Sequence, residues 1–194
     1  MNFASQIIYS AAYKLNPDGT RASAAETELQ ANGESDYINT SWTYDAQDRL
    51  TSETVASSLA ADNYTDNYTF DLDGNRMSEV KINPATGVNE YIFYTYNGQN
   101  QLTQSTSSVS GVTNYSYDSN GNQTNDGTHQ YVYDIRNRLI AVKDESGNTL
   151  ATYGYDDAGD RVSETTFANG TGTTTYYLID DHNPTGYAQV IGKF

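Results

Sequence analysis

The stretches YVYDIRNR at residues 131–138 and YGYDDAGDR at residues 153–161 are two copies of the short pattern that decides the fold. The pattern is an aromatic residue, any residue, an aromatic residue or Leu, then Asp or Asn, a short polar gap, and Arg or Gln. The other copies are YKLNPDGTR from Tyr13, WTYDAQDR from Trp42, YTFDLDGNR from Tyr68, YTYNGQNQ from Tyr94 and YSYDSNGNQ from Tyr115. Such recurrence is typical of a repeat architecture, so the sequence predicts a scaffold and not a single active site.

Each copy predicts a β-hairpin. Residues i and i+2 of a strand share a face, so the two rings of a copy, such as Tyr94 and Tyr96, point the same way. The Asp or Asn that follows can accept hydrogen bonds from nearby backbone N–H groups and start a turn. Four copies place a glycine three residues later, at Gly19, Gly74, Gly121 and Gly159. This spacing fits a type I turn closed by a residue with positive φ.

The other three copies are one residue shorter and lack that glycine. They have Asp48, Asn100 or Asn137 instead, and Asp and Asn tolerate the left-handed region best after glycine. We therefore expect the same turn geometry in all seven copies.

The arginine position is the most specific detail of the pattern. Five of the six arginines occupy it, namely Arg21, Arg49, Arg76, Arg138 and Arg161, and glutamine fills the other two copies. A planar guanidinium there can stack on a ring across the hairpin while it bonds a turn carboxylate or carbonyl. Because a substrate-binding arginine would normally be unique, we expect a structural role.

Second turn signals lie between the copies, at residues 83–87, 107–111, 126–127, 146–148 and 169–170. The chain is therefore expected to be an all-β antiparallel meander with two strands per repeat. The turn Asx residues are 29 residues apart at Asn16 and Asp45 but 16 apart at Asp118 and Asp134. This predicts strands of about eight residues early and about four near Asp118, in a sheet that narrows and curls. Residues 22–29, the one helix-like segment, are expected to be a loop or degraded strand.

The composition limits the possible functions. Eighteen tyrosines and one Trp, against few aliphatic residues, predict a fold built around tyrosine. A net charge of −15 argues against nucleic acid or an anionic membrane as a partner. There is no Cys for a disulfide or a thiolate metal site, and no apolar run is long enough to insert into a membrane.

These Tyr-Asp copies resemble the RHS/YD-repeat family, which includes bacterial contact-dependent toxins, insecticidal toxin-complex shells and teneurins. The segment YYLIDDHNPTGYAQV at residues 176–190 is similar to the one that closes the repeat region in bacterial members. The resemblance implies hairpin strips that spiral into a cocoon-like, β-solenoid shell around a toxin. Because this chain has about seven units and ends before any core or toxin segment, we expect a fragment or a shortened member.

The resemblance implies a non-enzymatic shell segment of a secreted or cell-surface bacterial protein that encapsulates or presents a toxin or effector. The expected array is single, with a degenerate first repeat or edge at 1–36, regular hairpins at 37–175 and the closing segment at 176–194. The expected partners are further shell repeats or a second copy at exposed strand edges, and a toxin domain or glycans. The alternative is a cell-surface carbohydrate-binding or adhesion module, because exposed rings can stack on sugars.

Catalytic and metal sites have little support in the sequence. The loops at 71–75 and 118–122 suggest calcium, but they lack the EF-hand spacing and turn geometry explains their residues. His129 and His182 are the only histidines, and no G-x-S-x-G elbow is present. No pair of carboxylates stands out for glycoside hydrolysis. We therefore predict no catalytic residue, metal or cofactor.

The candidate site residues are consequently the structural repeat positions themselves. They are Tyr44, Asp45, Arg49, Tyr68, Asp71, Gly74, Arg76, Tyr94, Tyr96, Tyr115, Tyr117, Asp118, Gly121, Tyr131, Tyr133, Asp134, Arg138, Tyr153, Tyr155, Asp156, Gly159 and Arg161.

Overall fold

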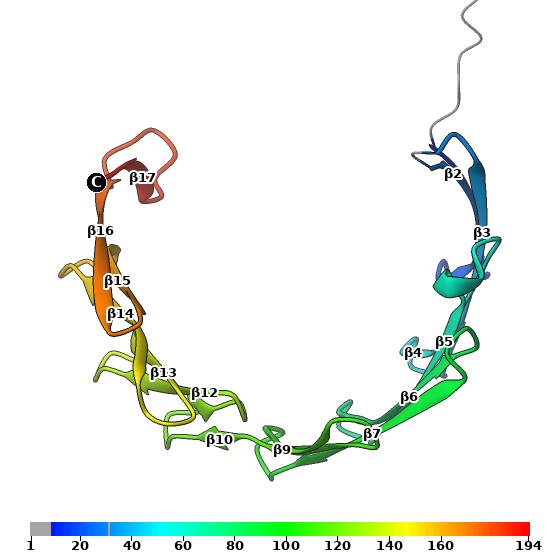
Figure 1. Cartoon of the computed structure of the whole chain (residues 1–194), viewed down its shortest axis with the longest axis horizontal. Helices are drawn as coiled ribbons and strands as arrows, with labels where there is room; N and C mark the ends of the chain where they lie inside the picture. The colour runs from blue at the N-terminus through cyan, green and yellow to red at the C-terminus, as the bar shows by residue number, and fades with distance from the viewer. Residues whose placement is uncertain (1–8, 31) are drawn as a thin grey trace, which may run out of the picture. The chain divides into compact units, whose positions relative to one another are not determined.

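The computed structural model describes residues 9–30 and 32–194 as two units, divided between Val112 and Thr113. The expectations for residues 1–8, including the start of the first predicted segment, lie outside the described residues. Each unit is built on one antiparallel sheet in which strands pair with their neighbours in sequence (Figure 1), and the last strand of the first sheet, residues 111–114, spans the division. The predicted all-β antiparallel meander is confirmed.

The first sheet has nine strands in the order β1 to β9. They are β1 (Tyr9–Leu15), β2 (Arg21–Leu29), β3 (Ser35–Tyr44), β4 (Leu50–Ser57), β5 (Tyr64–Phe70), β6 (Arg76–Asn83), β7 (Val88–Tyr96), β8 (Leu102–Ser107) and β9 (Gly111–Asn114). A single 3₁₀ turn, η1 (Ala60–Asp62), connects β4 to β5.

The second sheet has eight strands in the order β10 to β17. They are β10 (Ser116–Tyr117), β11 (Gln123–Asn125), β12 (His129–Tyr133), β13 (Leu139–Asp144), β14 (Thr149–Tyr155), β15 (Arg161–Ala168), β16 (Thr171–Asp180) and β17 (Gln189–Lys193). The predicted change in strand length is confirmed, since β3 has 10 residues and β10 has two.

The helix-like segment at 22–29, expected to be a loop or degraded strand, is part of the full strand β2: the loop alternative was wrong, and the strand is not degraded. β2 pairs with β1 on one side and with β3 on the other along nearly its whole length. Cross-strand pairing on both sides outweighs the intrinsic helix propensity of its Ala and Glu residues, which amounts to only tenths of a kcal/mol per residue.

Every Tyr-Asp hairpin carries a register shift just before its second aromatic residue or Leu. The shifts fall at Lys14/Leu15, Thr43/Tyr44, Thr69/Phe70, Thr95/Tyr96, Ser116/Tyr117, Val132/Tyr133 and Gly154/Tyr155. A bulge of this kind inserts one extra residue and increases the local twist. The repeat therefore includes an irregularity that the sequence pattern did not reveal.

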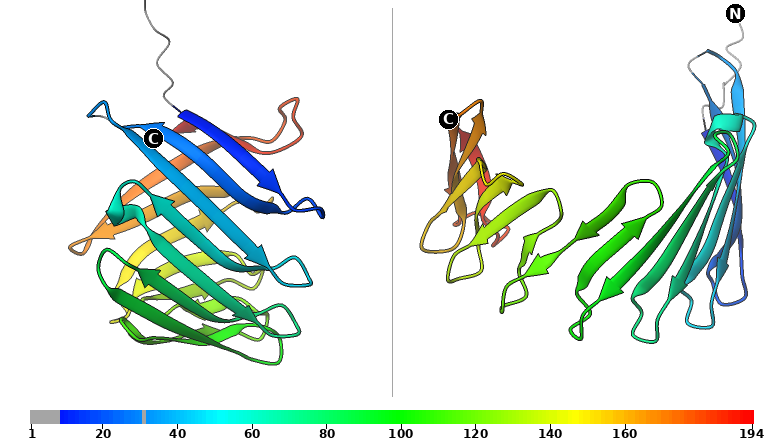
Figure 2. Two further views of the ribbon diagram at one scale, coloured as in Figure 1. Left: turned by 90° about the vertical axis from the view of Figure 1, so that its right-hand side faces the viewer. Right: turned by 60° about the horizontal axis from the view of Figure 1, so that its bottom comes forward.

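Taken by itself, each unit is a single layer of strands (Figure 2). Among the described residues the only buried apolar side chains are Ala24 and Ala151, whereas the carboxylates Asp36 and Glu79 are buried with 2% and 7% exposure. The described residues therefore have no core of large aliphatic side chains, as predicted, but no tyrosine is buried in them either. Backbone ladders and cross-strand side-chain pairs hold these sheets together.

Candidate functional site

The seven Tyr-Asp turns share one backbone geometry. In each, the N–H of the Asx residue donates to the carbonyl four residues later at 2.8–3.0 Å, and the N–H three residues later donates back at 3.0–3.3 Å. The closing residue has positive φ whether it is glycine (88–99°) or, at Asp48, Asn100 and Asn137, a side-chain-bearing residue (59–60°). The predicted left-handed conformation of these three residues is confirmed.

In the sequence, three copies of the pattern are one residue shorter than the other four, but this difference is not a difference in loop length. All seven loops close between the Asx and the fourth residue after it. What differs is the arginine: Arg49 and Arg138 occupy that fourth residue, inside the loop, whereas Arg21, Arg76 and Arg161 lie one residue later and begin a strand. The chain therefore has two kinds of repeat arginine, with different contacts.

The arginines inside the loops connect one hairpin to the next. Arg49 Nε lies 2.7 Å from Asp45 Oδ2 in its own turn, and its Nη1 donates to the carbonyl of Asp71 in the following turn at 2.8 Å. Its guanidinium lies 4.8 Å from the ring centre of Phe70. Each of these arginines thus contacts a carboxylate, a carbonyl and a ring from two neighbouring repeats.

Arg138 repeats this arrangement in the second unit. It bonds Asp134 in its own turn at 2.8 Å and the Asp156 carbonyl in the next at 3.1 Å. Its guanidinium stands 4.7 Å from the ring centre of Tyr155. The same interaction therefore occurs in both units.

Two of the three arginines that begin strands lie between two rings, whereas Arg21 lies 4.9 Å from the ring centre of Tyr13. Arg76 lies 5.6 Å from the ring centre of Tyr68 in its own hairpin and 4.7 Å from that of Tyr94 in the next. Arg161 lies 5.3 Å from the ring centre of Tyr153 and 5.5 Å from that of Tyr177. Such cation–π contacts contribute about 0.5–1 kcal/mol each where they are partly exposed.

In two copies the second aromatic residue reaches the preceding hairpin through its hydroxyl. Tyr96 donates to the Arg76 carbonyl at 2.9 Å, and Tyr155 donates to the Leu139 carbonyl at 2.8 Å. In both cases the acceptor is the residue paired with the second aromatic of the previous copy. Sequence reasoning missed this contact because it depends on the bulge and the register.

The remaining repeat positions lie in equivalent places. Three tyrosines end strands just before a turn: Tyr44, Tyr117 and Tyr133. Tyr131 lies within β12, and Tyr115 lies between β9 and β10. The turns that start at Asp71, Asp118 and Asp156 are closed by Gly74, Gly121 and Gly159. Side chains also join adjacent turns, because Asn75 Nδ2 donates to Asn100 Oδ1 at 3.0 Å and Asn122 Nδ2 donates to Asn137 Oδ1 at 2.9 Å.

Hydrogen bonds within the turns lower the pKa of three turn aspartates, Asp71, Asp118 and Asp134. The Asn75 amide and backbone N–H groups lower the pKa of Asp71, and Asn122 lowers the pKa of Asp118 in the same way. For Asp134, the Arg138 backbone N–H and side chain lower the pKa against the effect of burial. Stable carboxylate acceptors suit a fixed turn more than acid–base chemistry.

One face of the first sheet alternates rings with carboxylates. Cross-strand partners share a face, and the pairs Trp42 with Glu53, Glu53 with Asp66, Asp66 with Lys81 and Lys81 with Glu90 run across β3 to β7. The Trp42 indole donates to Glu53 at 2.6 Å, and the Tyr64 hydroxyl also donates to Glu53. We refer to this side of β3–β7 as the tyrosine–carboxylate face.

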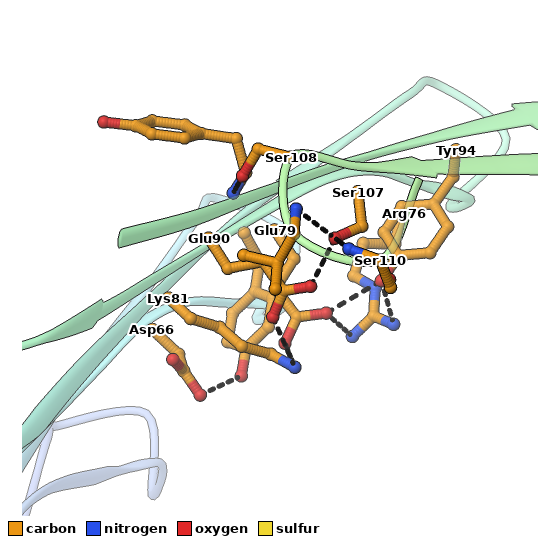
Figure 3. Close-up of polar contacts among 12 residues, drawn as sticks. Asp66, Arg76, Glu79, Lys81, Glu90, Tyr94, Ser107, Ser108 and Ser110 are labelled. Atoms are coloured by element: carbon orange, nitrogen blue, oxygen red, sulfur yellow. Dashed lines mark hydrogen bonds and ion pairs between the residues drawn. The ribbon is translucent and has the colours of Figure 1, made fainter. Parts of the chain in front are cut away.

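A network of charged groups lies on this face (Figure 3). Glu79 accepts from the Tyr94 hydroxyl at 2.8 Å and lies 3.3 Å from Arg76 Nη1. Lys81 Nζ lies 3.7 Å from Glu79 and 3.8 Å from Glu90. Burial raises the pKa of Tyr94, and the hydrogen bond to Glu79 adds to the effect.

The pKa of Asp66 is raised, unlike that of the turn aspartates. Burial is the larger cause and the nearby charge of Glu79 adds to it. The Tyr68 hydroxyl lies 3.5 Å from its Oδ2, at the limit of a hydrogen bond. Burial, together with the charge of Asp66, raises the pKa of Tyr68 to about 12.

The histidines do not form a triad in the residues that the structure describes. His129 Nδ1 lies 3.5 Å from Asp126 and its side chain is 39% exposed, whereas the His182 side chain next to Asp181 is 91% exposed. Across residues 9–30 and 32–194, no group of three or more His, Asp or Glu side chains could hold a metal ion. The described part of the chain also contains no helix with the length and apolarity needed to cross a membrane.

Comparison with known proteins identifies the class of this array. The family profile described as "Teneurin YD-shell" matches residues 20–190, and the chain therefore belongs to the teneurin YD-shell family. The resemblance to YD-repeat proteins seen in the sequence is confirmed.

Among curated proteins, the chain is 36% identical over 117 residues to the tRNA nuclease WapA of Bacillus subtilis (strain 168). It is 35% identical over 117 residues to the tRNA3(Ser)-specific nuclease WapA of Bacillus spizizenii. Each match covers 60% of this chain and 5% of the relative.

Among solved structures, the crystal structure of TcdB2-TccC3-TEV has a TM-score of 0.60 at 18% identity, covering 88% of this chain and 11% of that one. The crystal structure of TcdB2-TccC3-Cdc42 has a TM-score of 0.57 at 17% identity, covering 86% and 10%. At this identity the likeness concerns the fold alone.

Proposed function

We propose that this chain is a structural segment of a larger secreted or cell-surface bacterial RHS/YD-repeat shell, and that the shell encloses or presents a toxin or effector polypeptide. The repeat hairpins would form part of a curled, solenoid-like wall. Membership of the YD-shell family supports the shell function, and the fold shared with the TcdB2-TccC3 structures is consistent with it. The match covers only 5% of the length of the nuclease relative, and the proposal concerns the shell alone.

The observation that carries the proposal is the way in which each hairpin contacts the next. Arg49 and Arg138 bond the carbonyl of the following turn, and Tyr96 and Tyr155 bond a carbonyl of the preceding hairpin. The acceptors are backbone carbonyls, which every repeat has, so the contacts can recur along the array wherever a loop arginine or a tyrosine at the second aromatic position is present. A wall assembled in this way needs no second layer of strands.

Protection of an enclosed polypeptide tests the shell function. The protein that carries these residues would be isolated from its native source and subjected to limited proteolysis, with fragments identified by mass spectrometry. If the repeats form a shell, a polypeptide segment outside the repeats should resist cleavage in the native protein. The same segment should be cut in the Arg49→Ala/Arg138→Ala double variant, in which the contacts between hairpins are weakened. If cleavage of every non-repeat segment is equally fast in both proteins, enclosure is wrong.

One observation favours the alternative of carbohydrate binding or adhesion. Tyr91 and Phe93 lie two residues apart on β7, on the face opposite Lys81 and Glu90, and are 45% and 58% exposed. Adjacent open rings can stack on the apolar faces of sugars, and such aromatic exposure marks an interaction surface. Titration of glycans against NMR signals of this strand would show saturable shifts that Phe93→Ala removes.

A further inference from the structure

A cavity of about 480 Å³ opens on the tyrosine–carboxylate face of the first unit. It lies where β5, β6 and β7 meet the turn after β8. Its lining includes Tyr64, Asp66, Lys81, Val88, Glu90 and Val109. The volume falls within the range of sites that bind small groups, about 300–1,000 Å³.

The cavity has a surplus of negative charge. Its lining holds two carboxylates, Asp66 and Glu90, and one cation, Lys81. Outside the lining, Glu79 lies near Lys81 and Arg76, and Glu53 is the cross-strand partner of Asp66. Arg76 is already committed to Glu79 and Tyr94. Lys81 is shared between Glu79 and Glu90 at distances too long for hydrogen bonds, 3.7 and 3.8 Å. One further positive charge would improve the balance of this cluster.

Asp66 is the carboxylate with the weakest partner. Glu53 accepts from Trp42 and Tyr64, Glu79 accepts from Tyr94 at 2.8 Å and Glu90 accepts from Ser107 at 2.5 Å. Within the described part of the chain no cation forms an ion pair with Asp66 within 4 Å; its cross-strand partner Lys81 acts on it only through a weaker, longer-range attraction, and the nearest hydroxyl is 3.5 Å away.

We propose that this cavity receives a primary ammonium group, such as a lysine side chain of a polypeptide held against the sheet, with Asp66 and Glu90 as its acceptors. The Tyr64 ring and the methyl groups of Val88 and Val109 line the same cavity and would contact the aliphatic stem of the lysine. The ammonium has three donors, which match the carboxylate oxygens available here.

The inference rests on the proposed shell function, because it names the chemistry of the polypeptide that the wall would hold. The raised pKa of Asp66 is consistent with it, since an incoming cation would relieve the unfavourable environment of that carboxylate. A neutral sugar would leave the surplus negative charge in place, and the observations therefore favour the cation.

The test is a titration of the purified chain with a decapeptide of alternating Lys and Ser, followed by NMR. The matched ligand is the same peptide with every lysine Nε-acetylated, which removes the charge and keeps the stem. We expect saturable shifts at the backbone signals of Tyr64, Asp66, Lys81 and Glu90, and no saturable shift with the acetylated peptide.

Variants separate local recognition from general attraction to an acidic protein. Asp66→Asn should raise the Kd of the lysine peptide at least about fivefold. Asp157→Asn makes the same change of net charge at an exposed turn of the second unit, and it should change the Kd less than about twofold. Equal losses in the two variants, or equal binding of the acetylated peptide, would overturn the cavity proposal.

The experiment also distinguishes this inference from the shell function. If the lysine peptide fails to bind while the native protein still protects a polypeptide from protease, the cavity assignment is wrong and the shell function stands. If the peptide binds at the cavity but no polypeptide is protected, recognition of the ammonium group stands and enclosure fails.

Discussion

Two equivalent residues, Phe70 and Tyr155, differ only by a hydroxyl group. Both rings lie under a loop arginine, Arg49 and Arg138, at 4.8 and 4.7 Å. Tyr155 also donates to the Leu139 carbonyl. In the first unit the residue equivalent to Leu139 is Leu50, because Leu50 pairs with Tyr44 in the same way that Leu139 pairs with Tyr133. Phe70 has no hydroxyl to reach it.

Phe70→Tyr is therefore expected to stabilise the chain by about 1 kcal/mol, because one hydrogen bond is added without a change of packing. Urea unfolding followed by circular dichroism measures the change. The reverse substitution, Tyr155→Phe, should cost a similar amount. A Phe70→Tyr variant that is no more stable than the wild type would show that the two hairpins are not equivalent.

Asp66 should make stability depend on pH in the opposite direction to the turn aspartates. Its pKa in the folded chain is raised by burial and Glu79. The ionised carboxylate therefore disfavours the folded state above the folded pKa, and this penalty disappears below the unfolded pKa of about 3.9.

Asp66→Asn should accordingly unfold at a higher temperature than the wild type near pH 7, and the difference should vanish near pH 3. Differential scanning calorimetry across this pH range measures both midpoints. Asp71→Asn is the contrasting variant, because hydrogen bonds from Asn75 lower the pKa of Asp71. That variant should be less stable near neutral pH, and its deficit should shrink as the pH falls.

At the scale of the element, local residues specify the conformation of each turn, but they do not specify the contacts that join one turn to the next. An Asx followed three residues later by Gly, Asp or Asn was enough to predict every closing residue with positive φ. The bulge was not predictable, because it depends on which partner residue the second aromatic meets across the hairpin. The shared loop length was not visible in the sequence either, because the arginine does not mark the end of the loop: Arg49 lies inside its loop, whereas Arg76 lies one residue beyond its own.

Asp48 gives a direct test of the turn at this scale. It has φ 59°, where a side chain costs about 1–2 kcal/mol for most residues and less for Asp or Asn. Asp48→Gly should therefore gain about 0.5–1 kcal/mol of stability, and Asp48→Ala should lose about 1 kcal/mol. Urea unfolding followed by Trp42 fluorescence measures both. If Ala and Gly have equal effects, the left-handed conformation does not limit this turn.

At the scale of the whole molecule, we expect the exposed strand edges to be where the chain meets other chains. β17 pairs with β16 on one side and forms the edge of its sheet. Ile191 and Phe194 at this edge are 60% and 74% exposed, and an apolar edge is a template for pairing with a second strand. The same edge would serve for a second copy or for a further repeat of the proposed wall.

We therefore expect the purified chain to associate with itself as its concentration rises, measured by size-exclusion chromatography with light scattering. Ile191→Lys places a charge on the edge and should shift the chain toward monomer. Ile135→Lys is the matched control, because Ile135 is 99% exposed in a turn and away from a strand edge. A monomer at every concentration, or equal effects of the two lysines, would exclude pairing through β17, because the charge would then act only through net repulsion between molecules.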